Sequence, residues 1–379
     1  MFDYETLRIL WWGLLGVVLI GFALTDGFDL GVAALLPFVA RTDSERRMVI
    51  NSVGPTWEGN QVWFITGGAA IFAAWPFVYA VSFSGLYLAM FVVLASLILR
   101  PVGFKYRSKR PDPAWRARWD WALFVGGFVP ALVFGVAVGN VLTGLPFRLD
   151  SDMRSFYEGN FLGLFMPLPL LCGLLSVAML VLHGSAWLAM KIEHGVVHDR
   201  ARRFGTVAAI LSIMLFAMGW AYVAYGAVGF RIVSPVDPFG PSNPLRMTSE
   251  QVTGGWLTNY GLHPWMMIAP ALGFIGALLA LFGIRRQSEG AAFAGSSVST
   301  VGIIATVGLS MFPFILPSRI DAHSSLTVWN ASSSEKTLGI MLFVVVVFLP
   351  IVLAYTSWAY RVMWGRVTSH DVATNPDFY

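Results

Sequence analysis

Long apolar runs, separated by short polar segments, dominate the hydrophobic pattern of this 379-residue chain. A helix that crosses a bilayer needs about 20 apolar residues, each of which adds about 1.5 Å. Nine runs come close to this length or exceed it, and each predicts one transmembrane helix. In chain order, the runs cover approximately residues 9–39, 59–76, 78–99, 119–143, 161–190, 204–228, 264–284, 293–316 and 336–362.

The composition agrees with this pattern. Hydrophobic residues make up 56% of the chain and charged residues 12%, against about 25% charged residues in soluble domains. The longest polar loop, residues 229–263, is rich in Pro, Gly and Ser and is too short to form a separate domain. We therefore predict an all-α fold, a polytopic membrane helix bundle, with one membrane domain over residues 1–379.

Lys and Arg residues gather in alternate loops. Most of the 25 basic residues follow the first, third, fifth, seventh and ninth predicted helices. Because cytoplasmic loops are enriched in Lys and Arg, we predict an N-terminus outside the cytoplasm and a cytoplasmic C-terminus. This distribution explains the net charge of +4 as a topology signal, without a nucleic-acid partner.

Two carboxylates, Asp26 and Asp29, interrupt the first apolar run in the segment GFALTDGFDLGVAALL. The uncharged stretch from Ile9 to Thr25 covers roughly 25 Å of helix, so both lie deep, towards the cytoplasmic half. Their i,i+3 spacing places them on one helix face. A charge at the bilayer centre costs at least about 2.5 kcal/mol, so such residues usually face the bundle interior with a partner. The alternative is that this helix end protrudes and Asp26 lies at the interface.

A third acid, Glu58, opens the second predicted helix from the cytoplasmic side in the segment PTWEGNQVWF. An acid in the first turn stabilises the helix dipole, which is one explanation. The other is a point of proton uptake, because Trp57, Asn60, Gln61 and Trp63 surround the carboxyl and desolvation favours proton exchange near neutral pH. The residues alone leave both explanations open.

The third predicted helix ends at Arg100, on the same side. Arg100 either snorkels to the interface or turns inward as the counter-ion of Asp29 or Glu58. Asp120, which begins the fourth predicted helix, is more typical of a helix cap than of a proton relay.

Histidine is scarce, and among the six histidines only His183 lies well inside a predicted span. His194 and His198 have i,i+4 spacing in a basic stretch, which favours a solvent-exposed helix face over a metal site. No pair on facing helices could ligate a haem, so no metal site is predicted in this chain. A phosphate-binding Walker loop is also missing from the sequence. Two classes remain: a proton-conducting subunit of a redox complex, or a proton-coupled secondary transporter with buried acids.

Several motifs along the whole chain resemble subunit II of cytochrome bd-type quinol oxidases, the CydB family, its cyanide-insensitive branch included. The motifs are DYETLRILWW (3–12), TDGFDLG (25–31), ERR (45–47), WEGNQVW (57–63), GGAAIFAAWPFVYA (67–80), LRPVGFKYR (99–107), GNVLTGLPF (139–147), MFPFILPS (311–318) and SSLTVW (324–329).

The resemblance implies a subunit of a complex in the bacterial inner membrane that oxidises quinol and reduces oxygen to water. It implies that subunit I carries two haem b groups and one haem d, that this chain holds no haem ligands, and that it is not catalytic alone. A small single-pass accessory subunit, and a tightly bound quinone that fills a cavity as a structural lipid would, are further expected partners.

The resemblance also implies a cytoplasmic proton path that supports proton motive force. Glu58 matches the acid of the family's W-[DE]-G-N-Q motif, although many relatives have Asp there. Asp29 and Arg100 fall on family motifs as well, and we expect them to form one cluster with Asp26 and Glu58. The residues that are expected to line the path, the interface with subunit I or an oxygen or quinone cavity are Trp57, Trp63, Asn60 and Gln61.

Overall fold

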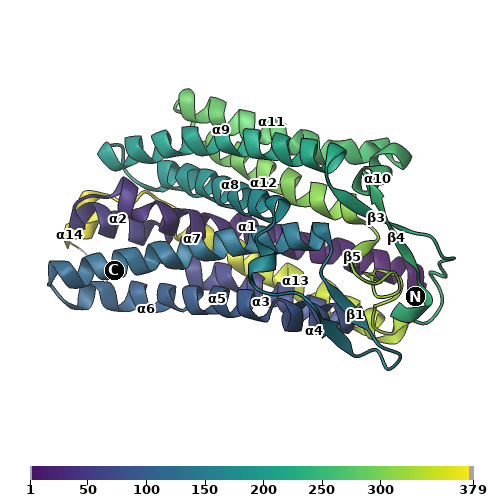
Figure 1. Cartoon of the computed structure of the whole chain (residues 1–379). Coiled ribbons are helices and arrows are strands. Elements are labelled where there is room, and N and C mark those ends of the chain that lie inside the picture. Colours follow the sequence, from purple (N-terminus) through teal and green to yellow (C-terminus); the bar gives the residue numbers. More distant parts are fainter. Residues whose placement is uncertain (1, 375–379) are drawn as a thin grey trace.

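The computed structural model describes residues 2–374 as a bundle of long helices that run along one common direction (Figure 1). Within this part of the chain, eight helical segments are long and apolar enough to cross a membrane. Seven of them are built on α1 (Tyr4–Val39), α7 (Pro113–Thr143), α8 (Pro167–Lys191), α9 (Val196–Tyr225), α11 (Ile268–Arg285), α12 (Glu289–Met311) and α13 (Glu335–Val362). The eighth combines α5 (Tyr87–Leu97), α6 (Leu99–Tyr106) and the 3-10 turn η1 (Arg107–Lys109). The all-helical membrane bundle is thus confirmed.

The second and third predicted spans differ from the structure. The second forms α3 (Trp57–Ala74), whose 18 residues begin with the polar sequence WEGNQ, so α3 is less apolar than the other eight segments. The third falls on two helices, α4 (Pro76–Gly85) and α5, which meet at Leu86. A proline, Pro76, also separates α4 from α3. Proline suits the first turn of a helix and cannot continue the previous one.

Close helix contacts depend on glycine. A Cβ atom on Gly31 of α1 would lie 2.0 Å from the carbonyl oxygen of Leu180 on α8, and one on Gly302 of α12 would lie 2.1 Å from the backbone nitrogen of Gly273 on α11. Membrane helices associate through such close backbone packing rather than through the hydrophobic effect. These positions hold α1 against α8 and α11 against α12.

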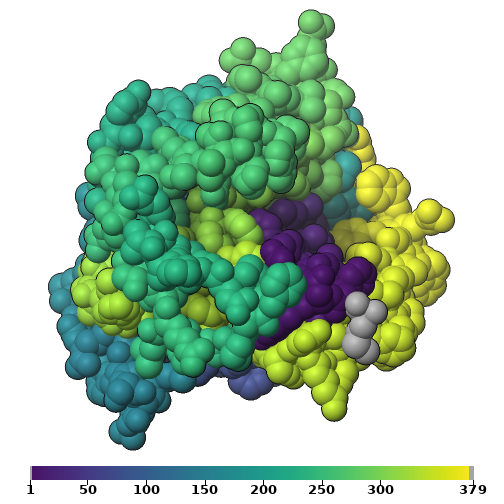
Figure 2. All heavy atoms as spheres, turned by 90° about the vertical axis from the view of Figure 1, so that its right-hand side faces the viewer, coloured from purple at the N-terminus to yellow at the C-terminus, as the bar shows by residue number. Residues whose placement is uncertain are grey.

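Three short antiparallel hairpins and the N-terminus share one end of the bundle, which we name the strand end (Figure 1). The pairs are β1 (Phe147–Leu149) with β2 (Ser155–Tyr157), β3 (Val228–Ile232) with β4 (Ser249–Thr253), and β5 (Phe314–Leu316) with β6 (Leu326–Thr327). Figure 2 shows this end, with the purple N-terminal segment between the green loops and the yellow C-terminal helix. The strands were not predicted, because two to five residues are too few to show an alternating pattern. The short helix α10 (Thr258–Leu262) and the 3-10 turns η2 (Leu162–Leu164), η3 (Pro244–Arg246), η4 (Gly255–Leu257) and η5 (Pro264–Met267) complete the connections.

The opposite end, which we name the basic end, collects the Lys- and Arg-rich loops together with α2 (Asp43–Val53) and α14 (Ser369–Thr374) (Figure 1). The sequence pattern did not predict α2, although Thr42 and Glu45 form a capping box at its start. Partial burial raises the pKa of Glu45, but hydrogen bonds from the amides of Arg41 and Thr42 and from Arg200 bring that pKa below its usual value. The first described residues and the described C-terminal residues lie at opposite ends of the bundle (Figure 1). Which end is cytoplasmic stays a prediction. Residues 1 and 375–379 of the predicted domain lie outside the described residues.

Candidate functional site

A buried ion pair joins α1 to α6. Arg100 donates hydrogen bonds from Nη1 and Nη2 to the two carboxylate oxygens of Asp26, at 3.0 and 2.6 Å. Both side chains are almost completely inaccessible, with exposed fractions of 0% for Arg100 and 1% for Asp26. Gly126 of α7 gives the arginine stem its room, because a Cβ atom there would lie 3.0 Å from Cγ of Arg100. Arg100 therefore turns inward, but its direct partner is Asp26 rather than Asp29 or Glu58. Asp26 lies inside the helix bundle and not on its surface.

Asp29 belongs to a second chain of contacts, which links three helices. Asn60 of α3 donates from Nδ2 to Oδ2 of Asp29 at 2.8 Å, and the hydroxyl of Tyr360 on α13 donates to Oδ1 of Asn60 at 2.6 Å. Sequence reasoning missed Tyr360, because its hydroxyl is one of several polar groups near the end of α13, where Tyr355, Thr356 and Ser357 precede it. We name Asp26, Arg100, Asp29, Asn60 and Tyr360 the buried polar network.

Several polar atoms of this region lack a partner among the described residues. They include Oδ1 of Asp29, Nε of Arg100 and Nε1 of Trp57. Buried polar atoms are nearly always hydrogen-bonded to protein or to ordered water. The unused donors and acceptor here are therefore suited to water, which is also the usual carrier of protons between fixed groups.

Trp57 and Trp63 have different surroundings. The ring of Trp57 is buried and stacks on Phe104 with centroids 5.0 Å apart, while the Arg100 guanidinium lies 5.9 Å from the Trp57 ring. Trp63 instead covers Gly21 of α1, where a Cβ atom would lie 2.7 Å from the indole. Trp57 thus forms a wall of the buried polar network, and Trp63 packs α3 against α1.

Glu58 does not join the expected cluster. Its side chain is exposed, and within residues 2–374 it makes no hydrogen bond or ion pair. Residues two apart on a helix do not share a face, so Asn60 points inward while Glu58 points outward; Gln61 is half-buried. The prediction that Glu58 clusters with Asp26, Asp29 and Arg100 is therefore wrong for this chain by itself. This chain also leaves the Glu58 carboxyl in contact with solvent, where desolvation was expected.

A separate group of charges ties the basic end together. Buried Asp120 accepts hydrogen bonds from Nε of Arg107 at 2.5 Å and from Nη1 of Arg46 at 2.8 Å. Arg107 and Arg116 also contact Asp43, at 2.9 and 2.6 Å. We name these five residues the arginine cluster. Asp120 is not a helix cap, because Asp112 caps α7 by accepting from the amide of Ala114.

His183 is fully buried, and both of its ring nitrogens have partners. Nδ1 lies 2.8 Å from Oγ of Ser296, and Nε2 lies 3.0 Å from the carbonyl oxygen of Leu24. Its ring also stacks on Phe293 at 4.8 Å. The residue therefore connects α8 to α1 and α12 and offers no free ligand atom.

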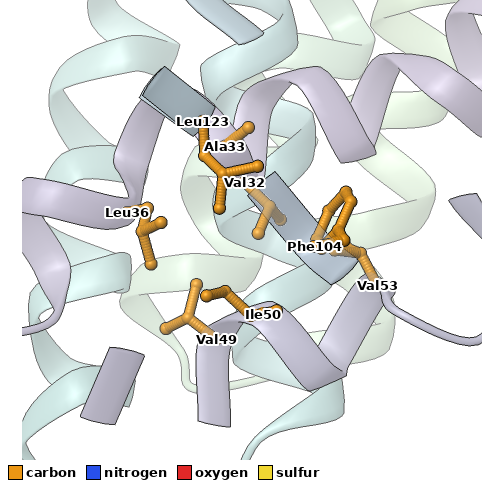
Figure 3. Close-up of a pocket in the computed structure, with 8 residues that line it drawn as sticks. All are labelled: Val32, Ala33, Leu36, Val49, Ile50, Val53, Phe104 and Leu123. Carbon is orange, nitrogen blue, oxygen red and sulfur yellow. The ribbon is translucent and has the colours of Figure 1, made fainter. Parts of the chain in front are cut away.

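A small cavity between α1, α2, α6 and α7 is lined by side chains that carry only carbon (Figure 3). Its volume of about 10 Å³ is at the lower limit for one water, which would also need polar partners. This cavity is therefore dry and provides no route for protons. Its lining residues are Val32, Ala33, Leu36, Val49, Ile50, Val53, Phe104 and Leu123.

Comparison with known proteins points to one family. A family model described as cytochrome bd terminal oxidase subunit II matches residues 7–363. Cytochrome bd-I ubiquinol oxidase subunit 2 of Escherichia coli (strain K12) is 48% identical over 375 residues, which cover 99% of each chain. The probable cytochrome oxidase subunit 2 of Haemophilus influenzae is 47% identical with the same coverage. Cytochrome bd ubiquinol oxidase subunit 2 of Bacillus subtilis is 29% identical over 97% of this chain and 99% of its own.

A solved structure gives the same fold at low sequence identity. A chain of the bd oxidase from Geobacillus thermodenitrificans matches with a TM-score of 0.69 at 14% identity, over 94% of this chain and 98% of that chain. At this identity the likeness concerns the fold alone.

Proposed function

Because this chain belongs to the cytochrome bd terminal oxidase subunit II family, we propose that its buried polar network takes up cytoplasmic protons for the oxygen reduction that a haem-bearing subunit I performs. The chain is a multi-pass membrane subunit of a bd-type ubiquinol oxidase. The family match over residues 7–363 favours this function over that of a proton-coupled transporter.

The observation that carries the proposal is the excess of acid in the buried polar network. One arginine faces two carboxyls, and both hydrogen bonds from its terminal nitrogens go to Asp26. Asp29 keeps one oxygen without a partner among the described residues. Ionisable groups inside membrane helices are costly and are a mark of function. Asp29 is thus placed to bind and release a proton while the Asp26–Arg100 pair stays fixed.

Proton uptake begins at Glu58 in this proposal. Glu58 is exposed at the start of α3, two residues before Asn60, at the basic end. The carboxyl can collect a proton there, and water against the unpartnered atoms of Trp57 and Arg100 can carry it inward to Asp29. Subunit I, when it docks, would cover Glu58 and restrict its contact with solvent.

The exposed face around Glu58 supports docking of subunit I at this place. Only 6% of the most apolar part of α13 is buried within the chain, and the Tyr360–Asn60 bond puts the cytoplasmic half of α13 beside α3. The large apolar side chains that α3, α5 and α13 expose include Val62, Ile65, Phe72, Leu88, Phe91, Leu94, Phe343, Val346, Ile351 and Trp358. Exposed apolar side chains of a membrane helix contact either lipid or a partner. The exposed carboxyl of Glu58 beside them would be costly against lipid, which favours a partner subunit at this place.

The cofactors of the proposed complex belong with the partner. Haem b and haem d would supply the electron transfer and oxygen chemistry, but the residues of this chain do not fit a haem, because His183 has no free nitrogen and the other histidines lie in loops or at helix ends. A structural quinone is part of the proposal as well. The larger of two described cavities, about 200 Å³ between Tyr87 and Tyr157 at the strand end, is below the roughly 300 Å³ of usual ligand pockets. A complete quinone site would therefore need the partner subunit.

Purification of the tagged chain from its native membranes tests the assembly. We expect a haem-bearing subunit I and a small single-pass subunit to copurify, with b- and d-type haem bands in the reduced-minus-oxidised spectrum and oxygen uptake with quinol. A stable colourless chain that is isolated alone, without oxidase activity, would contradict the proposal.

A further inference from the structure

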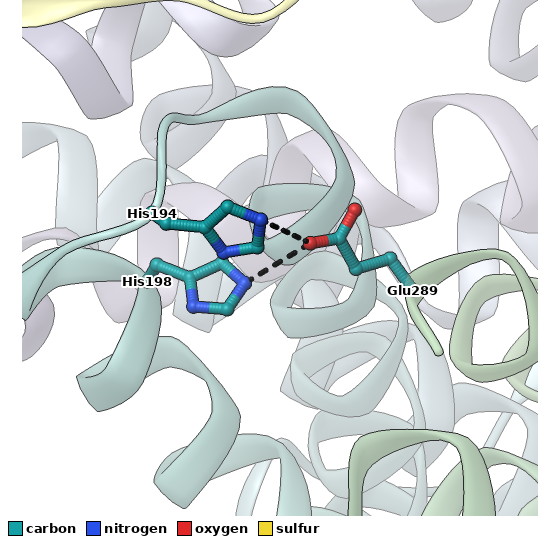
Figure 4. A group of neighbouring side chains, drawn as sticks. All are labelled: His194, His198 and Glu289. Atoms are coloured by element: carbon teal, nitrogen blue, oxygen red, sulfur yellow. Dashed lines mark hydrogen bonds and ion pairs between the residues drawn. The ribbon is translucent and has the colours of Figure 1, made fainter. Parts of the chain in front are cut away.

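Two histidines and a glutamate that are not part of the buried polar network meet near the starts of α9 and α12 (Figure 4). His194 precedes α9, His198 lies in its first turn, and Glu289 begins α12. The sequence favoured a solvent-exposed face for both histidines. That holds for His194, whose side chain is 68% exposed, but it is wrong for His198, which is 4% exposed.

Both imidazole rings point a nitrogen at the same carboxylate oxygen. Nε2 of His198 lies 3.3 Å and Nε2 of His194 lies 3.6 Å from Oε1 of Glu289. The three possible ligand atoms all lie within 4.8 Å of one another. Tetrahedral zinc, with bonds of about 2.0–2.2 Å, separates its ligands by about 3.4 Å. The three side chains therefore need only small movements to surround one ion.

We propose that His194, His198 and Glu289 form a binding site for Zn²⁺ at the cytoplasmic side of the chain. Two imidazoles and one carboxylate suit an ion of intermediate softness such as zinc. A fourth coordination position is open to water, since His194 faces solvent. The bound ion would join the start of α9 to the start of α12.

The surroundings of the site match those of metal ligands. Oδ1 of Asp199 lies 3.6 Å from Nδ1 of His198, which is longer than a hydrogen bond. A small movement would bring it to the second nitrogen, where a carboxylate commonly orients a metal-bound histidine. Arg366 pairs with the other oxygen, Oε2, of Glu289. That contact leaves Oε1 as the ligand atom and extends the site to the segment after α13.

An ion-pair network without metal is the competing explanation. It requires a proton on each nitrogen that faces Oε1, and the two ring centroids are only 4.6 Å apart. Two neutral imidazoles with their protons on Nε2 could donate to Oε1 together, but only His198 comes within hydrogen-bond distance, at 3.3 Å. The nitrogen of His194 lies 3.6 Å away, beyond a normal hydrogen bond. A divalent ion would bind all three atoms at once, and zinc binding distinguishes the two explanations.

Equilibrium dialysis of the purified, chelator-treated complex against radioactive Zn²⁺ tests the site. We expect the complex with His194→Ala/His198→Ala to bind one zinc fewer per chain than the unmodified complex. The matched control is His263→Ala, which removes an exposed histidine from the strand end and should leave zinc binding unchanged. Equal zinc binding by the double variant and the unmodified complex would overturn the proposal.

A milder variant keeps the test decisive if the double variant does not assemble. His194→Ala removes a largely exposed side chain and should weaken zinc binding at least about tenfold, the loss of one of three protein ligands. X-ray absorption at the zinc edge should show two imidazole nitrogens and carboxylate oxygen in the unmodified complex. Unchanged affinity in His194→Ala, or a zinc shell without imidazole, would contradict the assignment. None of these results depends on proton uptake through Asp29.

Discussion

The buried polar network and the arginine cluster are both built from Asp and Arg, but their balance of charge is opposite. In the arginine cluster three arginines surround two aspartates at the basic end, and each carboxylate has two arginine partners. In the buried polar network two carboxylates share one arginine inside the helix bundle. Paired charges at the end of a bundle connect neighbouring helices. A carboxylate without its own counter-ion inside the membrane instead raises the free energy of the folded protein. The difference separates a structural group of charges from a candidate proton site.

Asp26→Ala should produce the largest change. It would leave Arg100 buried without its partner, at a cost of about 3–5 kcal/mol. We expect the amount of assembled, haem-containing complex in membranes to fall sharply. Asp29→Asn, which leaves no unpaired cation, is the matched control and should assemble. Normal assembly of Asp26→Ala would show that the pair does not hold α1 against α6.

Asp120→Asn should come next and should act on stability alone. It weakens the hydrogen bonds of Asp120 to Arg107 and Arg46, each worth about 1.5–3 kcal/mol as a bond between charged groups. Thermal unfolding of the complex should shift to lower temperature, while oxygen consumption per haem stays unchanged. If turnover per haem fell while stability stayed normal, Asp120 would take part in turnover, and the arginine cluster would not be purely structural.

Glu58→Gln should reduce turnover without affecting assembly. Loss of a proton-exchanging group lowers the rate about 100-fold or more, and Glu58 makes no hydrogen bond or ion pair within residues 2–374 that the change could break. Oxygen consumption with excess quinol and the haem spectrum are the two measurements. Glu335→Gln, an exposed acid in the first turn of α13 at the strand end, is the control. Full turnover in Glu58→Gln would place proton uptake elsewhere.

Tyr360→Phe should give the smallest effect. The change removes one hydrogen bond to Asn60, worth about 0.5–1.5 kcal/mol, and so loosens the amide that faces Asp29. We expect oxygen consumption to fall about threefold, which corresponds to the low end of that range of free energies. The haem content should stay normal. A loss as large as that of Glu58→Gln would instead make the hydroxyl itself part of the proton path.

The helices could be predicted from the sequence because apolar length alone defines a membrane span. Burial of Asp26 and Asp29 followed from the same argument. The partner of Arg100 could not be predicted, because spacing along one helix says nothing about the rotation of its neighbour. Tyr360 was missed for a similar reason, since only the packing of α13 against α3 brings its hydroxyl to Asn60. Glu58 points outward, to a face that a partner subunit would cover. Its final surroundings could not be predicted, because they depend on the sequence of that partner.

Oxygen turnover of Asp29→Asn in the assembled oxidase tests the central claim most directly. The amide preserves the size of the side chain and can still accept the hydrogen bond from Asn60, but it cannot carry a proton. We predict normal haem spectra and a turnover about 100-fold lower, because one proton-transfer group is lost. Asp120→Asn should keep its turnover. Unchanged turnover in Asp29→Asn would contradict the account and reduce the buried polar network to a structural contact.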